Sequence, residues 1–476
     1  MPVLSTDGIS FDVHVPVIIV GAGACGLTAA LAARDVGADV LILERDAQPS
    51  GSTAMSQGNI AAAGTDSQRQ HGIEDSGEIF ANDIVALARG ETDAPLARLF
   101  ADASGPTVDW LVERHQIPLA LDPDWGAMLG HSRPRIHTVP TKTGRELITC
   151  LEDATARAGA NLLTDAHVVD VYADATGQVR GVAYVRPDGA RKTVGCDALV
   201  LATCGFGGNP DMVRQYIPGM ADALYHGHEG NQGEGIQWGL ELGAAAADMS
   251  AFQGLGALAE PHRVLVHYNI ILRGGIIVNN DGVRFADEST DISGMGRKVT
   301  AQPGHIAWFI YDRARHEFVL RYEEYEEALQ VGAVREAGSL AALAEGATIP
   351  AGALEETVAA SVVMQRGEVR DPFGRDFTLS KALDGPPWYA IRVCGALFHT
   401  QGGLVIDGEA RVCRSDGSML PNLFAGGGTA RSISGPSDWG YIAAAGLFTA
   451  VTQGRLAGAA AARLVRDARD FSAAAD

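Results

Sequence analysis

Several features of metalloproteins, secreted proteins and membrane proteins are missing from this sequence. Its six cysteines include no C-x-x-C pair, which excludes the usual iron–sulfur, haem and zinc motifs, so reduced thiols are expected. No stretch reaches the ~18 continuous apolar residues that a membrane helix needs. Residues 1–20 lack the basic start and long apolar run of a signal peptide. We therefore expect a cytoplasmic protein without a membrane span.

Positive charge is also scarce, because 37 lysines and arginines stand against 58 aspartates and glutamates, for a formal net charge of −21. Nucleic acid or an anionic membrane would be repelled, so neither is expected as a partner. With 46% hydrophobic and 20% charged residues, the 476-residue chain has the balance of a soluble globular protein of two or three domains.

The first part of the chain has the pattern of a strand, a helix and a second strand. An apolar run at 15–20 leads into a glycine-rich turn, an alanine-rich stretch at 27–36 and another apolar run at 38–43. Short apolar runs of this kind are typical of a buried parallel sheet. The pattern predicts a nucleotide-binding opening.

Two later segments extend this pattern. Residues 197–203 form an apolar run that closes on a glycine loop at 204–208, and residues 422–428 form another. A helix of small residues is expected at about 441–464. Both runs are predicted to be further strands of the same sheet.

The middle of the chain has a different pattern of predicted strands and helices. Two β-like runs within 275–285 are joined across Asn-Asp-Gly, which favours a tight turn, and a charged helical stretch follows at 321–328. An inserted domain is therefore expected, with the domains arranged as 1–230 (nucleotide-binding, first part), 231–370 (inserted capping and substrate domain) and 371–476 (nucleotide-binding, second part).

The glycine-rich turn fits the dinucleotide pattern G-x-G-x-x-G. Gly21 permits the tight turn, Gly23 lets the backbone approach a pyrophosphate, and Gly26 lets the helix pack closely on the strand. Glu44 follows the second strand, where a carboxylate accepts the hydrogen bonds of ribose hydroxyls. An acidic residue there favours an unphosphorylated ribose.

A loop rich in glycine and hydroxyl residues follows at 49–64. It supplies backbone N–H and side-chain donors suited to a pyrophosphate and to the edge of a flavin. This loop favours FAD and makes a dehydrogenase that uses NAD alone less suitable.

Seven motifs now stand in the order seen in one known family. After the glycine turn and the loop come segments at 202–208, 231–235, 284–288, 398–403 and 423–427. Nearly end to end, the chain resembles the flavoprotein family of succinate dehydrogenase and fumarate reductase, which also holds 3-ketosteroid dehydrogenases. The resemblance implies an α/β fold, a Rossmann-like FAD-binding domain of the glutathione-reductase type with an inserted α+β capping domain.

The motifs and the resemblance together predict where FAD is held. The expected cofactor-binding residues are Gly21, Gly23, Ala24, Gly26, Glu44, Arg45, Ser52, Ser56, Gln57, Gly58, Val168, Thr203, Gly205, Gly428 and Ile442. In the respiratory members a histidine is bonded covalently to the flavin, and the matching position here is Ser52. A hydroxyl cannot replace that imidazole link, so non-covalent FAD is expected.

The resemblance breaks on the substrate side. Fumarate reductases bind dicarboxylates with two histidines and two arginines, because a dianion in a site shielded from water needs paired cations. The matching positions here are Leu255, Ile292, Asp438 and His399, so one of four contacts is kept. A dicarboxylate substrate is not expected, unless arginines from shifted loops compensate; the candidates are Arg273 and Arg297.

Trp439-Gly440-Tyr441 replaces the lost arginine before the last helix. The segment is similar to that of the steroid Δ4-dehydrogenases, whose tyrosine lies beside the flavin and transfers a proton, although their nearby serine matches Ala443 here. A phenol can act as base or acid if a helix N-terminus or a hydrogen-bond chain lowers its pKa. Proton transfer and simple packing are both open for Tyr441.

His399 lies in the substrate-side loop of the family, which favours a contact with a substrate carbonyl over an ordinary core position. Other histidines lack metal-ligand spacing and are expected on the surface or a pocket wall: His226, His228, His262 and His267. Tyr268 and Trp125 are candidate pocket aromatics.

The predicted enzyme is an FAD-dependent dehydrogenase or reductase acting on CH–CH groups next to a carbonyl, with Tyr441 and His399 as catalytic residues. A cyclic ketone or ketosteroid-like molecule is the expected substrate, with hydride passing to or from the flavin N5 and an external electron acceptor or donor as partner. The alternatives are reduction of an unsaturated carboxylate, as in fumarate reductases, and a flavin-carrying electron-transfer subunit. Direction, acceptor and oligomeric state stay open.

Overall fold

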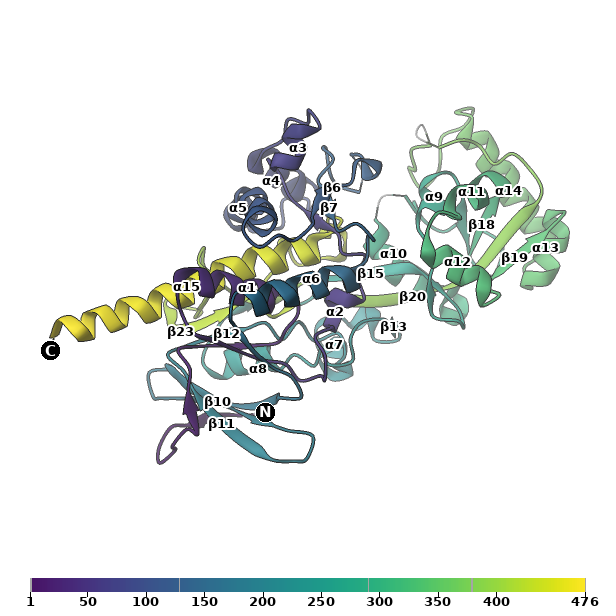
Figure 1. The fold of residues 1–476 in the computed structure, drawn as a ribbon. Coiled ribbons are helices and arrows are strands. Elements are labelled where there is room, and N and C mark those ends of the chain that lie inside the picture. Colours follow the sequence, from purple (N-terminus) through teal and green to yellow (C-terminus); the bar gives the residue numbers. More distant parts are fainter. Residues whose placement is uncertain (1, 128, 290, 378–379, 476) are drawn as a thin grey trace. The chain divides into compact units, whose positions relative to one another are not determined.

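The structure is a computed structural model that describes residues 2–127, 129–289, 291–377 and 380–475. Its contacts divide the chain into two compact units (Figure 1). The first unit comprises Met1–Tyr216, Gly227–Phe252 and His399–Asp476, and the second comprises Ile217–His226 and Gln253–Phe398.

A six-stranded sheet forms the centre of the first unit. Its order is β22-β23-β12-β3-β4-β8, and every pair except β22 with β23 is parallel. All of β3 is buried, as expected of a strand covered on both faces. The strands are β3 (Val17–Val20), β4 (Val40–Leu43), β8 (Asn161–Leu163), β12 (Ala198–Leu201), β22 (Arg411–Cys413) and β23 (Met419–Ala425).

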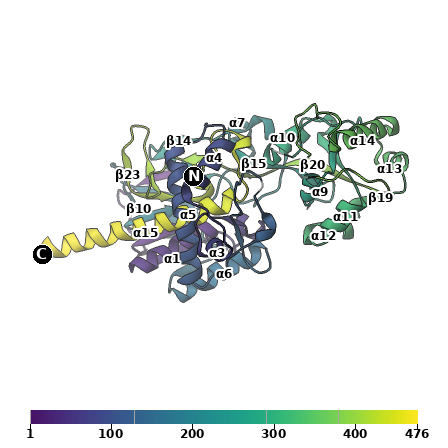
Figure 2. The same cartoon turned by 90° about the horizontal axis from the view of Figure 1, so that it is seen from above.

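Two helices pack against each other beside this sheet (Figure 1): α1 (Ala24–Val36) and α15 (Ala445–Ala475). Small residues permit the close contact, because a Cβ on Gly458 of α15 would collide with the backbone carbonyl of Ala29. The C-terminal end of α15 points away from the rest of the first unit in both views (Figure 2). These are the helices expected at 27–36 and 441–464.

Smaller elements complete the first unit. Three further sheets have the orders β1-β9-β10-β11-β2, β5-β7-β6 and β14-β21. Their strands are β1 (Val3–Ser5), β2 (Val13–His14), β5 (Ile60–Ala61), β6 (Ala120–Leu121), β7 (Ile136–Thr138), β9 (His167–Ala173), β10 (Val179–Val185), β11 (Arg191–Gly195), β14 (Ala246–Ala247) and β21 (Gly403–Leu404). The helices are α2 (Gly51–Ala54), α3 (Asp66–Gln70), α4 (Gly77–Leu87), α5 (Ala94–Glu113), α6 (Gly144–Arg157), α7 (Pro210–Tyr216) and α8 (Glu234–Glu241).

The second unit is built on one sheet with the path β16-β15-β20-β18-β17, and β13 and β19 also pair with β20. Buried apolar and aromatic side chains such as Phe309, Tyr311 and Ile391 form its core. The strands are β13 (Leu224–Tyr225), β15 (Phe252–Ala259), β16 (Val264–Leu265), β17 (Ile276–Val278), β18 (Ile306–Asp312), β19 (Val334–Ala337) and β20 (Trp388–Thr400). The helices are α9 (Asn269–Leu272), α10 (Ile292–Thr300), α11 (Arg313–Val319), α12 (Glu323–Gln330), α13 (Leu340–Ala347) and α14 (Ala351–Gln365).

The predicted α/β class with an inserted α+β unit is confirmed. The second unit covers 253–398 and 217–226, whereas the inserted segment was expected at 231–370. The later end follows from β20, which lies beyond residue 370 but pairs along its length with β18. The later start follows from α8, which packs on β21 of the first unit.

The Asn-Asp-Gly turn forms as expected, while the run after it does not become a strand. The N–H of Asn279 donates to the carbonyl of Val283, and the N–H of Gly282 donates to the carbonyl of Asn279, both at 3.0 Å. The strand before the turn, β17, pairs with β18 instead of with residues 283–285. The expected charged helix at 321–328 corresponds to α12.

Within the described ranges, no helix is both long and apolar enough to cross a membrane. The same residues contain no group of three or more histidine, cysteine, aspartate or glutamate side chains arranged to hold a metal ion. All six cysteines are free thiols, as expected.

Candidate active site

Two glycines of the turn between β3 and α1 stand where a side chain would not fit. Gly21 has a φ of 101°, and a Cβ there would collide with the carbonyl of Ala202; a Cβ on Gly26 would collide with the carbonyl of Gly21. By contrast, the nearest atom to a Cβ on Gly23 is Oγ1 of Thr53, at 3.6 Å. Gly23 is the N-cap of α1 and has no side chain that could cover the helix start. The open space at Gly23 suits a pyrophosphate at the N-terminus of a helix.

Glu44 joins the end of β4 to this turn. Its Oε2 atom accepts from the N–H of Ala22 at 2.7 Å, and its Oε1 atom accepts from the N–H of Asp46 at 3.0 Å. The carbonyl of Glu44 accepts from the N–H of Ala166 at 2.8 Å, which brings the start of β9 and its buried Val168 beside it. A half-buried carboxylate here has remaining lone pairs for ribose hydroxyls.

Arg45 points from the end of β4 to the start of α8. Its Nη1 atom lies 3.6 Å from Oε1 of Glu234. Close by, Nε2 of His228 lies 3.0 Å from Oδ2 of Asp46. If Glu44 binds a ribose, these polar side chains would line the adenosine end of a bound dinucleotide.

The loop at 49–64 lies against the start of α1. The hydroxyl of Thr53 accepts from the N–H of Ala24 at 3.0 Å. The hydroxyl of Ser56 donates to the carbonyl of Thr53 at 2.7 Å and accepts from the N–H of Gly58 at 3.1 Å. A Cβ on Gly58 would lie 2.8 Å from the carbonyl oxygen of Thr143, so the loop also depends on glycine there. Thr53 was not among the predicted contacts.

Ser52 has polar neighbours from two other segments. Its hydroxyl accepts from Nδ2 of Asn231 at 2.9 Å and lies 3.6 Å from Sγ of Cys204. Gln57 is half-buried in the same loop. The structure thus gathers the loop, the 202–208 motif and the 231–235 motif around Ser52.

The glycine loops that follow β12 and β23 contact each other. The hydroxyls of Thr203 and Thr429 are 3.1 Å apart, and a Cβ on Gly428 would lie 2.6 Å from the backbone nitrogen of Gly205. Ile442 is fully buried just before α15. We call these segments of the first unit the cradle, and the binding of FAD along them stays a prediction.

His399 and Tyr441 meet at the start of α15. Their ring centroids are 5.7 Å apart and the rings are nearly perpendicular, at 74°. Nε2 of His399 lies 2.9 Å from the place where a Cβ of Gly446 would stand. The backbone N–H of Gly446 also points to the hydroxyl of Tyr441, so the phenol lies at a helix N-terminus.

Burial keeps both side chains neutral. It lowers the pKa of His399 to about 4, although the carbonyl of Thr400 acts in the opposite direction. It raises the pKa of Tyr441, and the hydrogen bond from Gly446 offsets part of that rise. At neutral pH the pair is an uncharged imidazole and an uncharged phenol.

Comparisons with known proteins decide the family. The family model described as FAD binding domain matches residues 16–440. The chain belongs to this family. The match covers the glycine turn, the loop at 49–64 and the motifs that form the cradle.

Relatives and solved structures agree with this assignment. A fumarate reductase (cytochrome) of Shewanella frigidimarina is 29% identical over 453 residues, which are 94% of this chain and 77% of that protein. An open flavocytochrome c3 fumarate reductase superposes with a TM-score of 0.81 and 26% identity, over 96% of this chain and 79% of that one. A 3-ketosteroid-Δ4-(5α)-dehydrogenase of Rhodococcus jostii RHA1, solved with 4-androstene-3,17-dione, gives 0.78 and 26%, over 97% and 99%.

The protein is therefore an FAD-dependent oxidoreductase of the fumarate reductase family, and such enzymes act on carbon–carbon bonds. The predicted family, FAD cofactor and enzyme class are confirmed. The residues of the cradle fit this cofactor, because the turn has room for a pyrophosphate at Gly23 and a carboxylate for a ribose at Glu44.

An arginine that the sequence analysis missed lies in this FAD unit. Nη1 of Arg431 contacts Oδ2 of Asp93 at 2.8 Å, and Nε contacts Oδ2 of Asp248 at 2.6 Å. Two carboxylates thus neutralise this guanidinium. Asp438, which stands where the family has an arginine, is buried.

Other expected residues lie in the second unit and have contacts of their own. Arg273 lies 3.5 Å over the ring of Phe318, while Arg297 is exposed. Leu255 and Ile292 are half-buried, as expected for apolar residues at former anion contacts. The hydroxyl of Tyr268 donates to the carbonyl of Glu288 at 2.7 Å, so this ring belongs to the core of the second unit.

The other histidines and Trp125 differ in burial and in their contacts. His267 stacks on Tyr322 at 3.6 Å, and burial lowers its pKa to about 4. His226 contacts the ring of Phe398, and His262 is exposed. Trp125 is half-buried in a short 3-10 turn.

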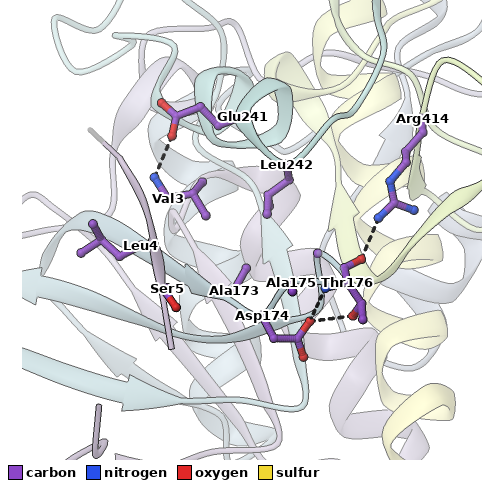
Figure 3. A pocket seen from close by; sticks show the side chains of 11 residues that line it. Val3, Leu4, Ser5, Ala173, Asp174, Ala175, Thr176, Glu241, Leu242 and Arg414 are labelled. Carbon is purple, nitrogen blue, oxygen red and sulfur yellow. Dashed lines mark hydrogen bonds between the residues drawn. The ribbon is translucent and has the colours of Figure 1, made fainter. Parts of the chain in front are cut away.

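A separate hollow of about 550 Å³ lies between β1, the turn after β9 and the end of α8 (Figure 3). Its polar groups bind one another: Glu241 accepts from the N–H of Val3 at 2.7 Å, and Arg414 donates to the carbonyl of Thr176 at 3.0 Å. None of the predicted site residues lines it, so it is not the active site.

Proposed function

We propose that this enzyme dehydrogenates, or in reverse reduces, the carbon–carbon bond α,β to a carbonyl group, with a cyclic ketone or ketosteroid-like molecule as substrate. The observation that carries the proposal is the neutral pair of His399 and Tyr441 at the start of α15. The likeness to a ketosteroid dehydrogenase over nearly the whole length of both chains supports it.

The charges of the site favour an uncharged substrate. A dicarboxylate entering a site shielded from water needs cations to compensate its desolvation. His399 is neutral, Asp438 replaces an arginine, and Arg431 is paired with two carboxylates. A ketone needs one hydrogen-bond donor at its oxygen, and a neutral imidazole supplies it.

The two side chains have complementary tasks in this chemistry. Bound FAD accepts or supplies the hydride. An N–H of His399 donates to the substrate carbonyl oxygen, which makes the neighbouring α-carbon more acidic. In reduction the phenol of Tyr441 donates its proton to the α-carbon; in dehydrogenation Tyr441 accepts the α-proton as a phenolate, after its own proton has passed to solvent. Its raised pKa keeps the phenol protonated at rest, which suits the reductive direction.

Reduction of an unsaturated carboxylate is the second candidate, favoured by the 29% identity to a fumarate reductase. On this view the substrate carboxylate would pair with Arg431, which would have to leave Asp93 and Asp248. A third candidate, a flavin-carrying electron-transfer subunit, would show no turnover without partner proteins. An external electron acceptor or donor completes the proposed cycle, and the cytoplasmic location stays a prediction.

One substrate panel separates these functions. FAD-loaded protein is assayed with saturated cyclic ketones and succinate plus an artificial acceptor, and with enones and fumarate plus a reductant. The proposal expects a ketone to be oxidised far faster than succinate and an enone to be reduced far faster than fumarate. A fumarate rate equal to the best enone rate would favour the carboxylate function, and no turnover of either class would favour the electron-transfer subunit.

A further inference from the structure

The side chain of Gln401 contacts the imidazole of His399. Its Nε2 atom lies 2.7 Å from Nδ1 of His399, and the residue is only 3% exposed. An amide NH2 group donates and does not accept, so Nδ1 must be the acceptor in this contact. A neutral imidazole that accepts at one nitrogen carries its proton on the other.

Ser434 contacts the other end of the Gln401 amide. Its hydroxyl donates to Oε1 of Gln401 at 3.1 Å, and this contact is buried. The backbone of Gln401 is held as well, since its N–H donates to Ala251 and its carbonyl accepts from Ser432, at 2.8 and 2.9 Å. In this arrangement the NH2 group of the amide faces His399 and its oxygen faces Ser434.

A second group competes for Nδ1 of His399. The carbonyl of Thr400 lies 3.4 Å from that nitrogen and would accept if Nδ1 carried the proton. Good N–H···O hydrogen bonds are about 2.7–3.2 Å long, so this contact is weak. The shorter contact with Gln401 therefore determines the tautomer.

We propose that Gln401 is a positioning residue that keeps the proton of His399 on Nε2. That nitrogen faces Gly446 in the first turn of α15, where a Cβ would stand 2.9 Å from it, so a side chain at this position would crowd the N–H. The catalytic meaning of this proton rests on the proposed function, in which the N–H donates to the substrate carbonyl.

The surroundings of the ring hold no carboxylate that would favour a second proton. In the described part of the FAD unit, the contacts of the His399 side chain are Gln401, Thr400, Gly446 and Tyr441. Tyr441 is the titratable group among these four, and it is a neutral phenol. The wild-type reaction is therefore expected to show no titration of His399 between about pH 5 and 8.

Gln401→Glu is the informative variant because it keeps the length of the side chain and the Ser434 contact but removes the NH2 donor. A carboxylate accepts, so Nδ1 of His399 must then carry a proton, and the pKa of the imidazole rises. Gln401→Met removes the amide with little change of volume, and Gln178→Glu adds the same charge elsewhere in the FAD unit as a control.

The tautomer is read directly by NMR. FAD-loaded protein labelled with 15N-histidine is compared as wild type, Gln401→Glu and His399→Phe, the last to identify the His399 signals. The proposal expects a protonated Nε2 and an unprotonated Nδ1 in wild type, and a protonated Nδ1 in Gln401→Glu. A protonated Nδ1 in wild type, or equal nitrogen shifts in wild type and Gln401→Glu, would overturn it.

The rate of flavin reduction by a ketone from the panel adds the functional readout. In Gln401→Glu the rate should be retained at low pH, where the imidazolium still carries Nε2–H, and fall by about 10²-fold as this proton is lost. Gln178→Glu should follow wild type. A changed tautomer with an unchanged pH profile would confirm the positioning role and count against the carbonyl contact of the proposed function, so the two failures can be told apart.

Discussion

Glu44 and Ala22 are joined by a hydrogen bond of 2.7 Å between the carboxylate and the backbone N–H. The side chain that is expected to bind the ribose therefore also fixes the glycine turn that approaches the pyrophosphate. The two halves of the dinucleotide site are coupled through one carboxylate, and its loss should affect both.

We expect Glu44→Ala to weaken FAD binding while the protein stays folded. The change removes hydrogen bonds to a charged acceptor, each contributing roughly 1.5–3 kcal/mol, so FAD affinity should fall by about 10- to 100-fold. Titration of the apoprotein with FAD, followed by flavin fluorescence, measures this.

Glu241→Ala is the matched control, because Glu241 also accepts from a backbone N–H at 2.7 Å, that of Val3, but lies at the hollow of Figure 3. Equal FAD affinity in Glu44→Ala and wild type would contradict the ribose role.

FAD should be released when the protein is precipitated with acid. Ser52 stands where the respiratory relatives carry their flavin-linked histidine, and its hydroxyl already accepts from Asn231 at 2.9 Å. The flavin spectrum should appear in the supernatant, where its chromatographic mobility identifies FAD. Flavin fluorescence that stays with the washed, denatured protein would show a covalent bond.

The glycine turn was predictable because its residues are neighbours in sequence and have local steric tasks. Gly21 and Gly26 are needed where a Cβ would collide with a carbonyl, and Glu44 follows the strand that the apolar pattern predicts. Such local patterns survive without knowledge of the tertiary fold.

Long-range partners could not be found in this way. Arg431 is paired with Asp93 and Asp248, which lie 338 and 183 residues away in sequence, and no periodicity links them. The Gln401 contact did have a signal: residues i and i+2 of an extended segment share a face, and His399 stands two residues earlier. Every extended segment has this spacing, so the spacing alone does not single out Gln401 as the partner of His399.

The limits of the second unit differ from the expected ones for a related reason. The strand β20 pairs with β18, which lies about 80 residues earlier in the chain. Pairing across such a distance is decided by the fold of the whole unit, not by local composition.

Arg284→Met should destabilise the second unit. The guanidinium of Arg284 donates to both carboxylate oxygens of Glu288, at 3.0 and 2.8 Å, and also pairs with Asp371. All three side chains are buried, so the variant takes a cation from Asp371 and leaves Glu288 with Arg375, at 2.9 Å, as its remaining ion-pair partner, at a cost of about 3–5 kcal/mol.

Thermal unfolding and limited proteolysis of the FAD-loaded protein measure the loss. Arg98→Met is the control, since Arg98 pairs with Asp102 at 2.7 Å on the surface, where an ion pair contributes up to about 1 kcal/mol. Equal unfolding temperatures for the two variants would show that the buried cluster stabilises the protein no more than the surface ion pair does.

Tyr441→Phe distinguishes proton transfer from packing. The variant keeps the ring beside His399 but removes the hydroxyl that Gly446 faces, so FAD content should be unchanged. If Tyr441 moves the proton, flavin reduction by a ketone from the panel should slow by about 10²-fold or more. If the ring only packs, the loss is a hydrogen bond of about 1 kcal/mol and the rate should fall by less than ~10-fold.

Anaerobic stopped-flow bleaching of the flavin measures the rate, with Tyr311→Phe as the matched control. The hydroxyl of Tyr311 is buried 2.8 Å from that of Tyr325 in the core of the second unit, so its removal tests a comparable loss away from the site. Proton transfer from the α-carbon to Tyr441 should give the rate an isotope effect with an α-deuterated ketone in the wild-type enzyme, and Tyr441→Phe should change this effect together with the rate. A near-wild-type rate in Tyr441→Phe would move the proton transfer to another group, and His399, whose ring lies 5.7 Å from that of Tyr441, would be the next residue to test.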